Sequence, residues 1–442
     1  MSAKIKELYK IIPSPQKIIT DTRLLKKGDV FWAIRGENFD GNNFVQEALN
    51  TGAAHVVCEQ EKFISNSRVS VVKDSLLCLQ EFASYHRQQL GIPVIAVTGT
   101  NGKTTTKELI FNVLRTKYQV SATQGNFNNH LGVPLSLLQF TDETEIGIIE
   151  MGANHVGEIA ALCKIAKPDY GIITNIGKAH LEGFGSFEGV IQAKTELYNY
   201  LKNKQIVINR ENEILKEHAH SKKIFSYGIS PAANLFGELV SSSPYLNIQI
   251  NKPKQFALST QLTGKYNFEN ILAAAAFGFI FNVSAENIAL AVQEYKPDNN
   301  RSQIIEYKSV KIIADAYNAN PASMIPAINN MFDSEYDTLY FILGDMLELG
   351  EYAQAEHVNI LEHLRKLEAN NPGKTVQTIL AGKEFQRATD ETEHTHPISY
   401  SHPDKICTFL KTIEISNAQM LIKGSRSMEL EKLLPCIKNS IV

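Results

Sequence analysis

The sequence has few cysteines, and they are widely scattered. No two of the five form a CxxC pair. An odd number of distant cysteines is typical of reduced thiols in a cytosolic protein, where cysteine behaves as a small buried hydrophobe. We therefore expect all five to fill cores without pairing. They are Cys58, Cys78, Cys163, Cys407 and Cys436.

An excess of charge of one sign is also missing. Lys and Arg number 44 and Asp and Glu number 47, which gives a formal net charge of −3. A protein that binds nucleic acid usually carries a basic excess or a basic patch, so we expect no nucleic-acid partner. Any anionic ligand has to be met by local positive groups.

Long hydrophobic runs are absent as well. The longest extends from Ile271 to Phe281 and is interrupted by Gly278. A helix needs about 20 apolar residues to cross a bilayer, so we interpret this run as a buried helix. Residues 1–7 contain no apolar signal region, and we expect a cytoplasmic protein without membrane insertion.

The order of strand-like and helical segments predicts an α/β protein with three domains. Residues 1–91 form a small α/β domain in this interpretation. Residues 92–300 alternate strands and helices, which predicts a mostly parallel sheet, and an alternating pattern over 234–262 adds a small antiparallel sheet. Residues 301–442 predict a second, Rossmann-like α/β domain. The polar segment 296–300 is the predicted linker.

The most informative segment is TGTNGKTTT, residues 98–106, between an apolar run and an amphipathic helical pattern. A glycine-containing turn between a strand and a helix directs backbone N–H groups and a helix N-terminus at one point, which favours a phosphate there. Lys103 would add charge, and the Thr104 hydroxyl could bind Mg²⁺. The general P-loop pattern has a glycine where this chain has Val97. A surface Gly-Lys turn is the alternative, and the three threonines and two glycines at the mouth of a buried strand argue against it.

Polar side chains follow the neighbouring strands of the same predicted sheet. Glu150 follows the strand 146–149, and His180 follows the strand 171–174 by a few residues. Carboxyl ends of parallel strands share one rim, so both side chains are candidate metal ligands beside Lys103. For His180 alone, a hydrogen-bonding core residue is an equally good interpretation.

Other polar residues give weaker evidence for a binding or catalytic site. The glycine-bounded loop with Asn126, Asn128 and Asn129 suits recognition of a polar ligand, or is a plain turn. Spacing alone does not distinguish Lys194 from a solvated lysine. The charged helix 356–368, with His357 and His363, is interpreted as a solvated face, and Trp32 as a core residue.

Several short sequence motifs, which follow one another in the family's order along the chain, resemble those of the Mur ligases. In the second domain these are TGTNGKTTT, Glu150-Met151-Gly152, NIGKAH ending at His180, and AKTEL around Lys194. In the first domain, Thr20–Arg23 followed by GDVFWAIRGENFDGNNF is similar to the family's UDP-sugar-binding segment. Four further motifs resemble the branch of the family that adds D-alanyl-D-alanine to the UDP-N-acetylmuramoyl tripeptide. They are DAYNANP, LGDMLELG, KGSR and GNFNNHLGVP.

This resemblance implies an ATP-dependent ligase of peptidoglycan precursor synthesis that works through an acyl phosphate. It implies catalytic roles for Lys103, Glu150, His180 and Lys194. The implied ATP-binding residues are Gly99, Thr100, Asn101, Gly102, Lys103, Thr104, Thr105, Asn267, Arg301, Asp315 and Asn318. The implied UDP-substrate residues are Asp21, Thr22, Arg23, Asn126, Asn128 and Asn129. The implied dipeptide residues in the third domain are Glu348, Lys423, Ser425 and Arg426.

The resemblance also implies two Mg²⁺ ions and a CO₂-derived carbamate on Lys194. The metal ligands would be Thr104, Glu150, His180 and the Lys194 carbamate. Two departures from the family pattern lie at the nucleotide end: Arg301 follows Asn300 where a glycine is usual, and Tyr266 precedes Asn267 where a histidine is usual. We expect a monomer whose third domain closes over the second about residues 296–300.

Two alternatives remain open from the sequence. One is a related ligase that adds a single amino acid, or a folate polyglutamylating enzyme. The other is a P-loop switch protein, which would need neither an amine acceptor nor the polar first domain.

Overall fold

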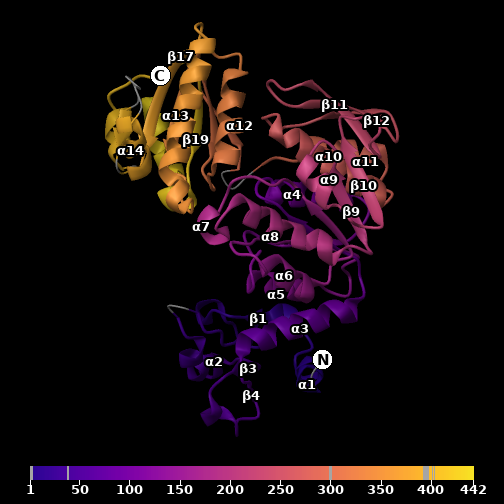
Figure 1. The fold of residues 1–442 in the computed structure, drawn as a ribbon. Coiled ribbons are helices and arrows are strands. Elements are labelled where there is room, and N and C mark those ends of the chain that lie inside the picture. Colours follow the sequence, from indigo (N-terminus) through magenta and orange to yellow (C-terminus); the bar gives the residue numbers. More distant parts are fainter. Residues whose placement is uncertain (1–2, 37–38, 298–300, 392–397, 401, 403) are drawn as a thin grey trace.

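Three α/β units follow one another along the molecule in the computed structural model, which describes residues 3–36, 39–297, 301–391, 398–400, 402 and 404–442. Figure 1 shows the N-terminal unit at the bottom, the central unit in the middle and the C-terminal unit at the upper left. Each unit has its own sheet. The predicted fold class is confirmed, including the Rossmann-like third unit.

The N-terminal unit is a four-stranded parallel sheet in the order β1-β2-β3-β4. Its strands are β1 (Ile18–Ile19), β2 (Val30–Trp32), β3 (His55–Cys58) and β4 (Val69–Val71). One face packs on α2 (Val45–Thr51) and the other on α1 (Ala3–Ile11) and α3 (Ser75–Leu90). Trp32 is buried as expected, and its indole Nε1 donates to the carbonyl of Ser75 at 2.8 Å.

The central unit has a nine-stranded sheet in the order β13-β12-β11-β10-β9-β8-β5-β7-β6. Its strands are β5 (Val94–Thr98), β6 (Val120–Ala122), β7 (Ile146–Glu150), β8 (Tyr170–Ile173), β9 (Gln205–Asn209), β10 (Lys223–Gly228), β11 (Leu235–Ser241), β12 (Asn247–Lys252) and β13 (Phe256–Ser259). The predicted antiparallel strands are β11 to β13. They do not form a separate sheet, because β11 pairs in parallel with β10 and so continues the main sheet.

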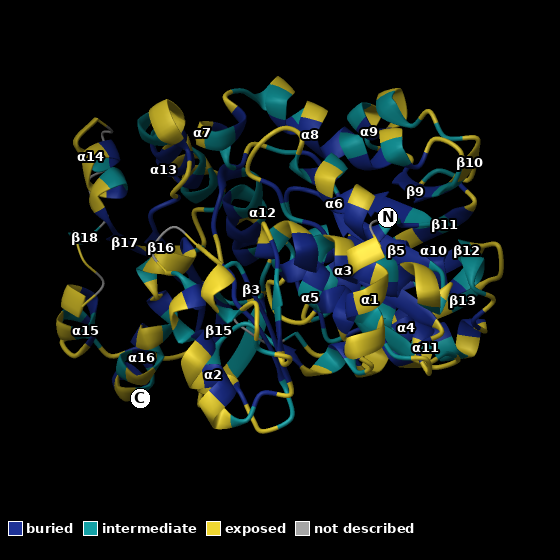
Figure 2. Cartoon of the chain, turned by 90° about the horizontal axis from the view of Figure 1, so that it is seen from below, coloured by how far each residue is buried: buried dark blue, intermediate teal, exposed yellow. Residues whose placement is uncertain are grey.

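Helices cover both faces of the central sheet. On one face lie α4 (Lys103–Leu114), α10 (Tyr266–Ile280) and α11 (Ala285–Glu294). On the other lie α3, α5 (Gly132–Leu138), α6 (Glu158–Ala166) and α8 (Phe187–Tyr200). Two shorter helices are α7 (Leu181–Phe184) and α9 (Glu213–His218). The apolar run 271–281 lies mostly in α10, whose interior is buried as predicted. In Figure 2 the central strand β5 is buried along its length, whereas the surrounding helices also carry exposed residues.

The C-terminal unit has six strands in the order β14-β15-β19-β16-β17-β18, of which only β14 is antiparallel to its neighbour. The strands are β14 (Gln303–Tyr307), β15 (Val310–Asp315), β16 (Thr338–Gly344), β17 (Thr375–Ala381), β18 (Ile398–Tyr400) and β19 (Ala418–Lys423). The helices are α12 (Pro321–Phe332), α13 (Ala353–Asn370), α14 (Lys383–Glu391), α15 (Asp404–Leu410) and α16 (Leu434–Ser440).

The 3₁₀ segments of the chain are η1 (Pro15–Lys17), η2 (Thr22–Leu24), η3 (Gly41–Phe44), η4 (Glu61–Phe63), η5 (Gly350–Tyr352), η6 (Arg426–Met428) and η7 (Leu430–Leu433).

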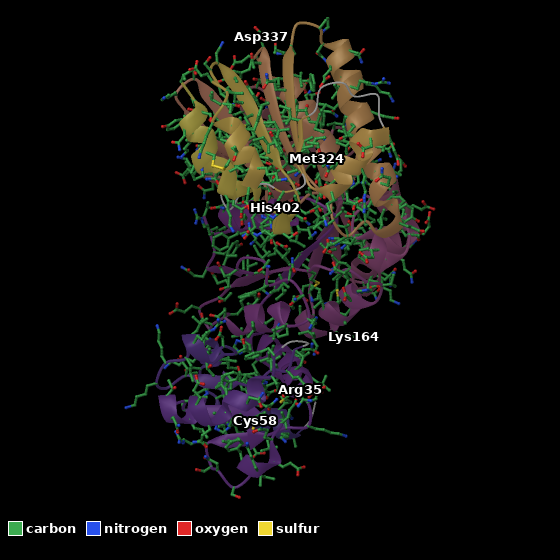
Figure 3. All side chains as sticks on the ribbon, turned by 90° about the vertical axis from the view of Figure 1, so that its left-hand side faces the viewer. Arg35, Cys58, Lys164, Met324, Asp337 and His402 are labelled. Carbon is green, nitrogen blue, oxygen red and sulfur yellow. A yellow bond between two sulfur atoms is a disulfide. The ribbon has the colours of Figure 1, made fainter. Side chains whose placement is uncertain are left out.

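The expectation of five unpaired cysteines is wrong for one pair. Cys407 on α15 and Cys436 on α16 form a disulfide, with their Cα atoms 5.4 Å apart, visible as the yellow bond in Figure 3. The packing of α15 against α16 brings together two residues that are 29 positions apart in sequence. Cys58, Cys78 and Cys163 are free and buried, as expected.

A buried arginine joins the N-terminal and central units. Arg87 on α3 donates to the carbonyls of Ala166 and Lys167 and pairs with Asp169 at 2.6 Å. The same carboxylate accepts from the backbone N–H of Val94, where β5 begins. A buried charge with several partners is costly to separate, so this contact holds α3 firmly against the central sheet.

The predicted domain boundaries stay predictions, because residues 298–300 of the linker lie outside the described residues. Among the helices of the described part of the chain, none has the length and apolar character needed to traverse a bilayer.

Candidate functional site

The phosphate loop has the strand–turn–helix geometry that its sequence predicts. β5 ends at Thr98, and α4 begins at Lys103 after two glycines with positive φ, Gly99 at 142° and Gly102 at 76°. A Cβ on Gly99 would lie 2.0 Å from Thr174 Oγ1, and one on Gly102 would lie 2.6 Å from Asn270 Oδ1. Both positions therefore need glycine for the backbone conformation and for space.

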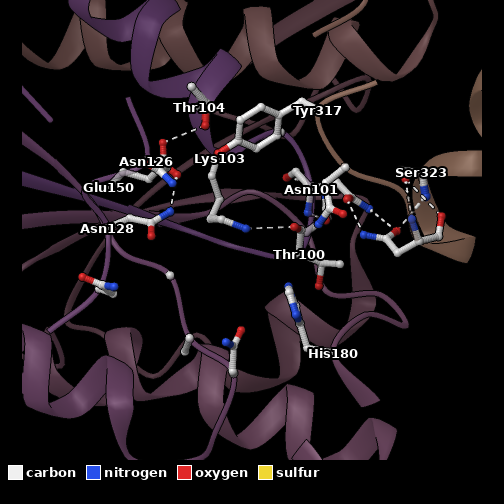
Figure 4. A pocket seen from close by; sticks show the side chains of 18 of the residues that line it. Thr100, Asn101, Lys103, Thr104, Asn126, Asn128, Glu150, His180, Tyr317 and Ser323 are labelled. Atoms are coloured by element: carbon white, nitrogen blue, oxygen red, sulfur yellow. Dashed lines mark hydrogen bonds between the residues drawn. The ribbon is translucent and has the colours of Figure 1, made fainter. Parts of the chain in front are cut away.

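Lys103 lies at the start of α4 and turns back over the loop. Its Nζ donates to the carbonyls of Gly99 at 2.8 Å and Thr100 at 2.9 Å, the second of which is drawn in Figure 4. Burial lowers the pKa of Lys103 to about 8, with Glu150 opposing this shift and Arg301 adding to it. The ammonium group is still mostly protonated near pH 7 and can bind an anion.

Glu150 ends β7 on the same rim and is buried. Its Oε2 accepts from the Thr104 hydroxyl at 2.9 Å, and its Oε1 accepts from Asn128 Nδ2 at 2.8 Å (Figure 4). The backbone N–H of Glu150 donates to Thr123 Oγ1, which fixes the strand end. A hydroxyl and a carboxylate on one rim are the oxygen donors that Mg²⁺ prefers.

No group of three or more His, Cys, Asp and Glu side chains within the described residues is arranged to hold a metal ion by itself. Mg²⁺ in nucleotide sites usually takes one or two protein ligands together with phosphate oxygens and water. Thr104 and Glu150 therefore fit one such ion bound jointly with a nucleotide.

His180 faces the C-terminal unit as well as the cavity. Its backbone is left-handed, with φ of 51°, and Nδ1 lies 2.7 Å from Glu348 Oε2. Glu348 is also left-handed, with φ of 65°, and His180 beside it lowers the pKa of this carboxyl. One ring nitrogen of His180 is thus engaged by the C-terminal unit, which the sequence did not suggest.

Lys194 is buried on α8, so its interpretation as a solvated lysine is wrong. Its Nζ lies 3.4 Å from the Ala153 carbonyl and 5.3 Å from the centre of the Phe184 ring. Burial, with a smaller effect from Lys103, lowers the pKa of Lys194 to about 7. Among the described residues Lys194 does not line the cavity itself, but Ala153 beside it does.

His357 is fully buried, so the solvated-face interpretation of its helix is wrong at this position. The backbone N–H of Met346 donates to His357 Nε2 at 3.0 Å. Since that nitrogen must then lack a proton, Nδ1–H donates to the Ala353 carbonyl at 2.6 Å. A neutral imidazole therefore holds the loop that carries Glu348.

The residues predicted to bind the nucleotide gather between the central and C-terminal units. Asp315 ends β15 and accepts from the backbone N–H of Ser302 at 3.0 Å and from Lys423 Nζ at 2.5 Å. Asn267 is buried at the start of α10 and accepts from Asn270 Nδ2. Arg301 stacks on the ring of Tyr317, with Cζ 3.5 Å from the ring centre.

These elements enclose a cavity of about 1640 Å³. The predicted site residues that line it are Thr100, Asn101, Gly102, Lys103, Thr104, Thr105, Asn126, Asn128, Asn129, Glu150, His180, Asn267, Arg301, Asp315, Asn318, Glu348, Lys423, Ser425 and Arg426. Gly99 and Lys194 lie behind this lining. Asp21, Thr22 and Arg23 lie elsewhere, and Asp21 caps η2 by accepting from the Arg23 backbone. An open-ended cavity shared by all three units suits large polar substrates.

Sequence reasoning missed the pair that joins the phosphate loop to the C-terminal unit. Asn101 and Asn320 exchange two side-chain hydrogen bonds, at 3.2 and 2.9 Å. Asn320 also caps α12 with Ser323 in a capping box. Both Asn320 and Tyr317 lie within DAYNANP, so the motif was visible, but nothing in the sequence singled out these members.

Comparison with known proteins agrees with this geometry. Residues 16–99 match the Mur ligase family catalytic domain, residues 97–278 the Mur ligase middle domain, and residues 300–397 the Mur ligase glutamate ligase domain. A UDP-N-acetylmuramoyl-tripeptide–D-alanyl-D-alanine ligase from Bacillus subtilis (strain 168) is 36% identical, over 94% of this chain and 92% of that protein. The chain belongs to the Mur ligase family.

Solved structures of related ligases are also similar to this chain in fold. A crystal structure of MurF from Acinetobacter baumannii matches with a TM-score of 0.85 at 30% identity, covering 95% of this chain and 93% of that chain. MurF ligase from Thermotoga maritima in complex with ADP matches with a TM-score of 0.85 at 26% identity, covering 96% of this chain and 97% of that chain.

The phosphate loop generates a first prediction. Gly102→Ala should weaken ADP binding at least about tenfold, because the new Cβ would displace Asn270 or the loop, and about 1.4 kcal/mol corresponds to that factor. Gly91→Ala is the matched control, since Gly91 also has a positive φ, of 64°, but has open space around it. Titration calorimetry with ADP measures both, and equal affinities would contradict the steric argument.

His357 generates a prediction on pH. Burial lowers its pKa below the ordinary value of 6.5, with Ala353, Asp345, Glu384 and Glu356 opposing the shift. As the pH falls below about 6.5, the unfolded chain takes up a proton that the folded protein resists, so the free energy of unfolding should decrease. His357→Gln should show a shallower decrease between pH 7 and pH 5 in denaturant unfolding. Exposed His402→Gln should keep the original slope, and an unchanged slope in His357→Gln would refute the assignment.

Proposed function

We propose that this Mur ligase joins D-alanyl-D-alanine to UDP-N-acetylmuramoyl-tripeptide at the expense of ATP, through an acyl phosphate, in peptidoglycan precursor synthesis. The observation that carries the proposal is the shared cavity, in which the phosphate loop, the Thr104–Glu150 pair and the KGSR segment face one space. The names of the 30–36% identical relatives supply the substrates.

The chemistry explains why cations surround the loop. A carboxylate has no good leaving group, so its attack on the γ-phosphate of ATP provides one, and the dipeptide amine then displaces phosphate to form the amide. Carboxylate and triphosphate are both anions, and two unit charges 4 Å apart repel by about 4 kcal/mol at an effective dielectric of 20. Lys103 and the N-terminus of α4 offset part of that repulsion.

Mg²⁺ fits this site, with Thr104 and Glu150 as its protein ligands, and would screen the phosphate charge when bound. His180 is the proposed ligand of a second ion, and its contact with Glu348 at 2.7 Å would then have to open or be shared. Asn128, hydrogen-bonded to Glu150, would keep that carboxylate oriented during the reaction.

The lowered pKa of the Lys194 amine supports the proposal that this residue is carbamylated. Carbamate formation needs a neutral amine and CO₂, and a pKa of about 7 leaves about half of the Lys194 side chains neutral at pH 7. The carbamate would be an anion, and Ala153, whose carbonyl lies 3.4 Å from Lys194 Nζ, lines the cavity of the proposed metal site. It would also relieve the repulsion between Lys194 and Lys103.

Residues Asp21, Thr22 and Arg23 remain proposed contacts of the UDP group, at a distance from the phosphate loop. Glu348, Lys423, Ser425 and Arg426 remain proposed for the dipeptide. A monomer in the cytoplasm, with the C-terminal unit closing over bound substrates to exclude water, also stays part of the proposal.

The activity is tested by ADP release. ADP should appear at an appreciable rate only when ATP, UDP-N-acetylmuramoyl-tripeptide and D-alanyl-D-alanine are all present, and hydroxylamine should trap the acyl intermediate. Equal release with single amino acids or with folate and glutamate would favour the related ligases. ADP release without any acceptor, with no trapped intermediate, would favour a nucleotide switch.

Lys194→Ala should lose most ligase activity and regain part of it with a small carboxylate such as acetate or formate. Protein treated with ¹³C-labelled bicarbonate should show a carbamate carbon signal that the variant lacks. Exposed Lys202→Ala, just beyond α8, is the matched control and should retain both activity and signal. Full activity of Lys194→Ala would refute the role of this residue.

A further inference from the structure

One aromatic ring lies beneath two arginines in the cavity. Arg301 Cζ is 3.5 Å from the centre of the Tyr317 ring, and Arg426 Cζ is 5.8 Å from the same centre. All three residues line the cavity, and Figure 4 labels Tyr317 among the side chains of that lining. Tyr317 therefore faces the same space as the phosphate loop and the KGSR segment.

The topology explains this meeting. Tyr317 follows the carboxyl end of β15, and Arg426 follows that of β19, which pairs with β15 in parallel. Arg301 precedes β14, which is antiparallel to β15, so its start lies at the same edge of the sheet. Three segments far apart in the sequence thus bring their side chains to one edge.

The ring is the main fixed partner of Arg301. Within the described residues Arg301 forms no ion pair, and it lines the same cavity as the phosphate loop. Arg426 is more exposed and pairs with Glu431 at 3.0 Å. The negative face of an aromatic ring attracts a guanidinium and still leaves its N–H groups free to bind an anion.

We propose that Tyr317 is a positioning residue that orients Arg301 toward the nucleotide phosphates and Arg426 toward the carboxylate of the acceptor dipeptide. The inference rests on the proposed function, because that function supplies two anionic substrates for the two guanidinium groups. One ring then links the two anion sites, and its loss removes a fixed contact from both arginines.

The ring and not the hydroxyl carries this role. Among the described residues the contacts of the Tyr317 side chain are those of its ring with Arg301 and Arg426. Tyr317→Phe keeps the π-face, whereas Tyr317→Leu keeps apolar bulk and removes it. The two variants therefore separate orientation of the arginines from simple filling of space.

The test measures the dissociation constant of ADP and the KM for D-alanyl-D-alanine at saturating ATP. Tyr317→Leu should raise the ADP dissociation constant roughly tenfold, the size expected for loss of a close, partly desolvated cation–π contact, and the dipeptide KM roughly fourfold, since the Arg426 contact is longer and more exposed. Tyr317→Phe should stay within about twofold of the wild type. Thermal unfolding of each variant reports folding, and Tyr317→Met replaces Tyr317→Leu if the latter is unstable.

Double variants show whether each effect of Tyr317→Leu depends on Arg301 or on Arg426. Adding Tyr317→Leu to Arg301→Met should weaken ADP binding no further, and adding it to Arg426→Met should raise the dipeptide KM no further. Additive losses, wild-type values for Tyr317→Leu, a change in only one of the two constants, or equal defects in the Phe and Leu variants would each overturn the proposal. ADP binding does not require ligation, so it tests the Arg301 contact even if the paired-substrate assay refutes the proposed function.

Discussion

The left-handed turn of the phosphate loop is the constraint on which the rest of the site depends. Gly99 and Gly102 let the chain reverse from β5 into α4 while Thr174 and Asn270 occupy the space that a Cβ at these positions would need. Any side chain at these positions would push the loop off its neighbours. The turn points the N-terminus of α4 into the cavity, and it places Thr104 within hydrogen-bonding distance of Glu150 on β7.

Contacts across the cavity tie the loop to the C-terminal unit. Asn101 pairs with Asn320, His180 approaches Glu348, and Lys178 pairs with Glu356 at 2.7 Å. Each contact joins a residue that follows a central strand to one in or near a helix of the other unit. These polar contacts are partly exposed, so each contributes little by itself. Buried apolar residues of the two units, such as Leu181 and Leu349, belong to one continuous core and add to the interface.

Two buried lysines lie at or just behind the wall of the cavity near the phosphate loop. Burial lowers the pKa of Lys103 to about 8 and that of Lys194 to about 7, and the charge of Lys103 adds to the lowering at Lys194. Such a site is costly when empty and favourable with an anion, because bound phosphate or a carbamate restores charge balance. The same reasoning applies to Arg301, whose fixed partner is a ring and not a carboxylate.

The sequence by itself determined the units that depend on local pattern. The glycine spacing before Lys103 specified the turn, and the apolar run 271–281 specified a buried helix, because backbone sterics and helical periodicity act over a few residues. Tertiary structure alone decided which distant side chains meet. The burial of His357, the Cys407–Cys436 disulfide and the stacking of Arg301 on Tyr317 depend on how separate strands and helices pack. The sequence around a lysine does not show whether its side chain is solvated or buried. The lowered pKa of Lys194 follows from its burial on α8, which depends on the tertiary structure.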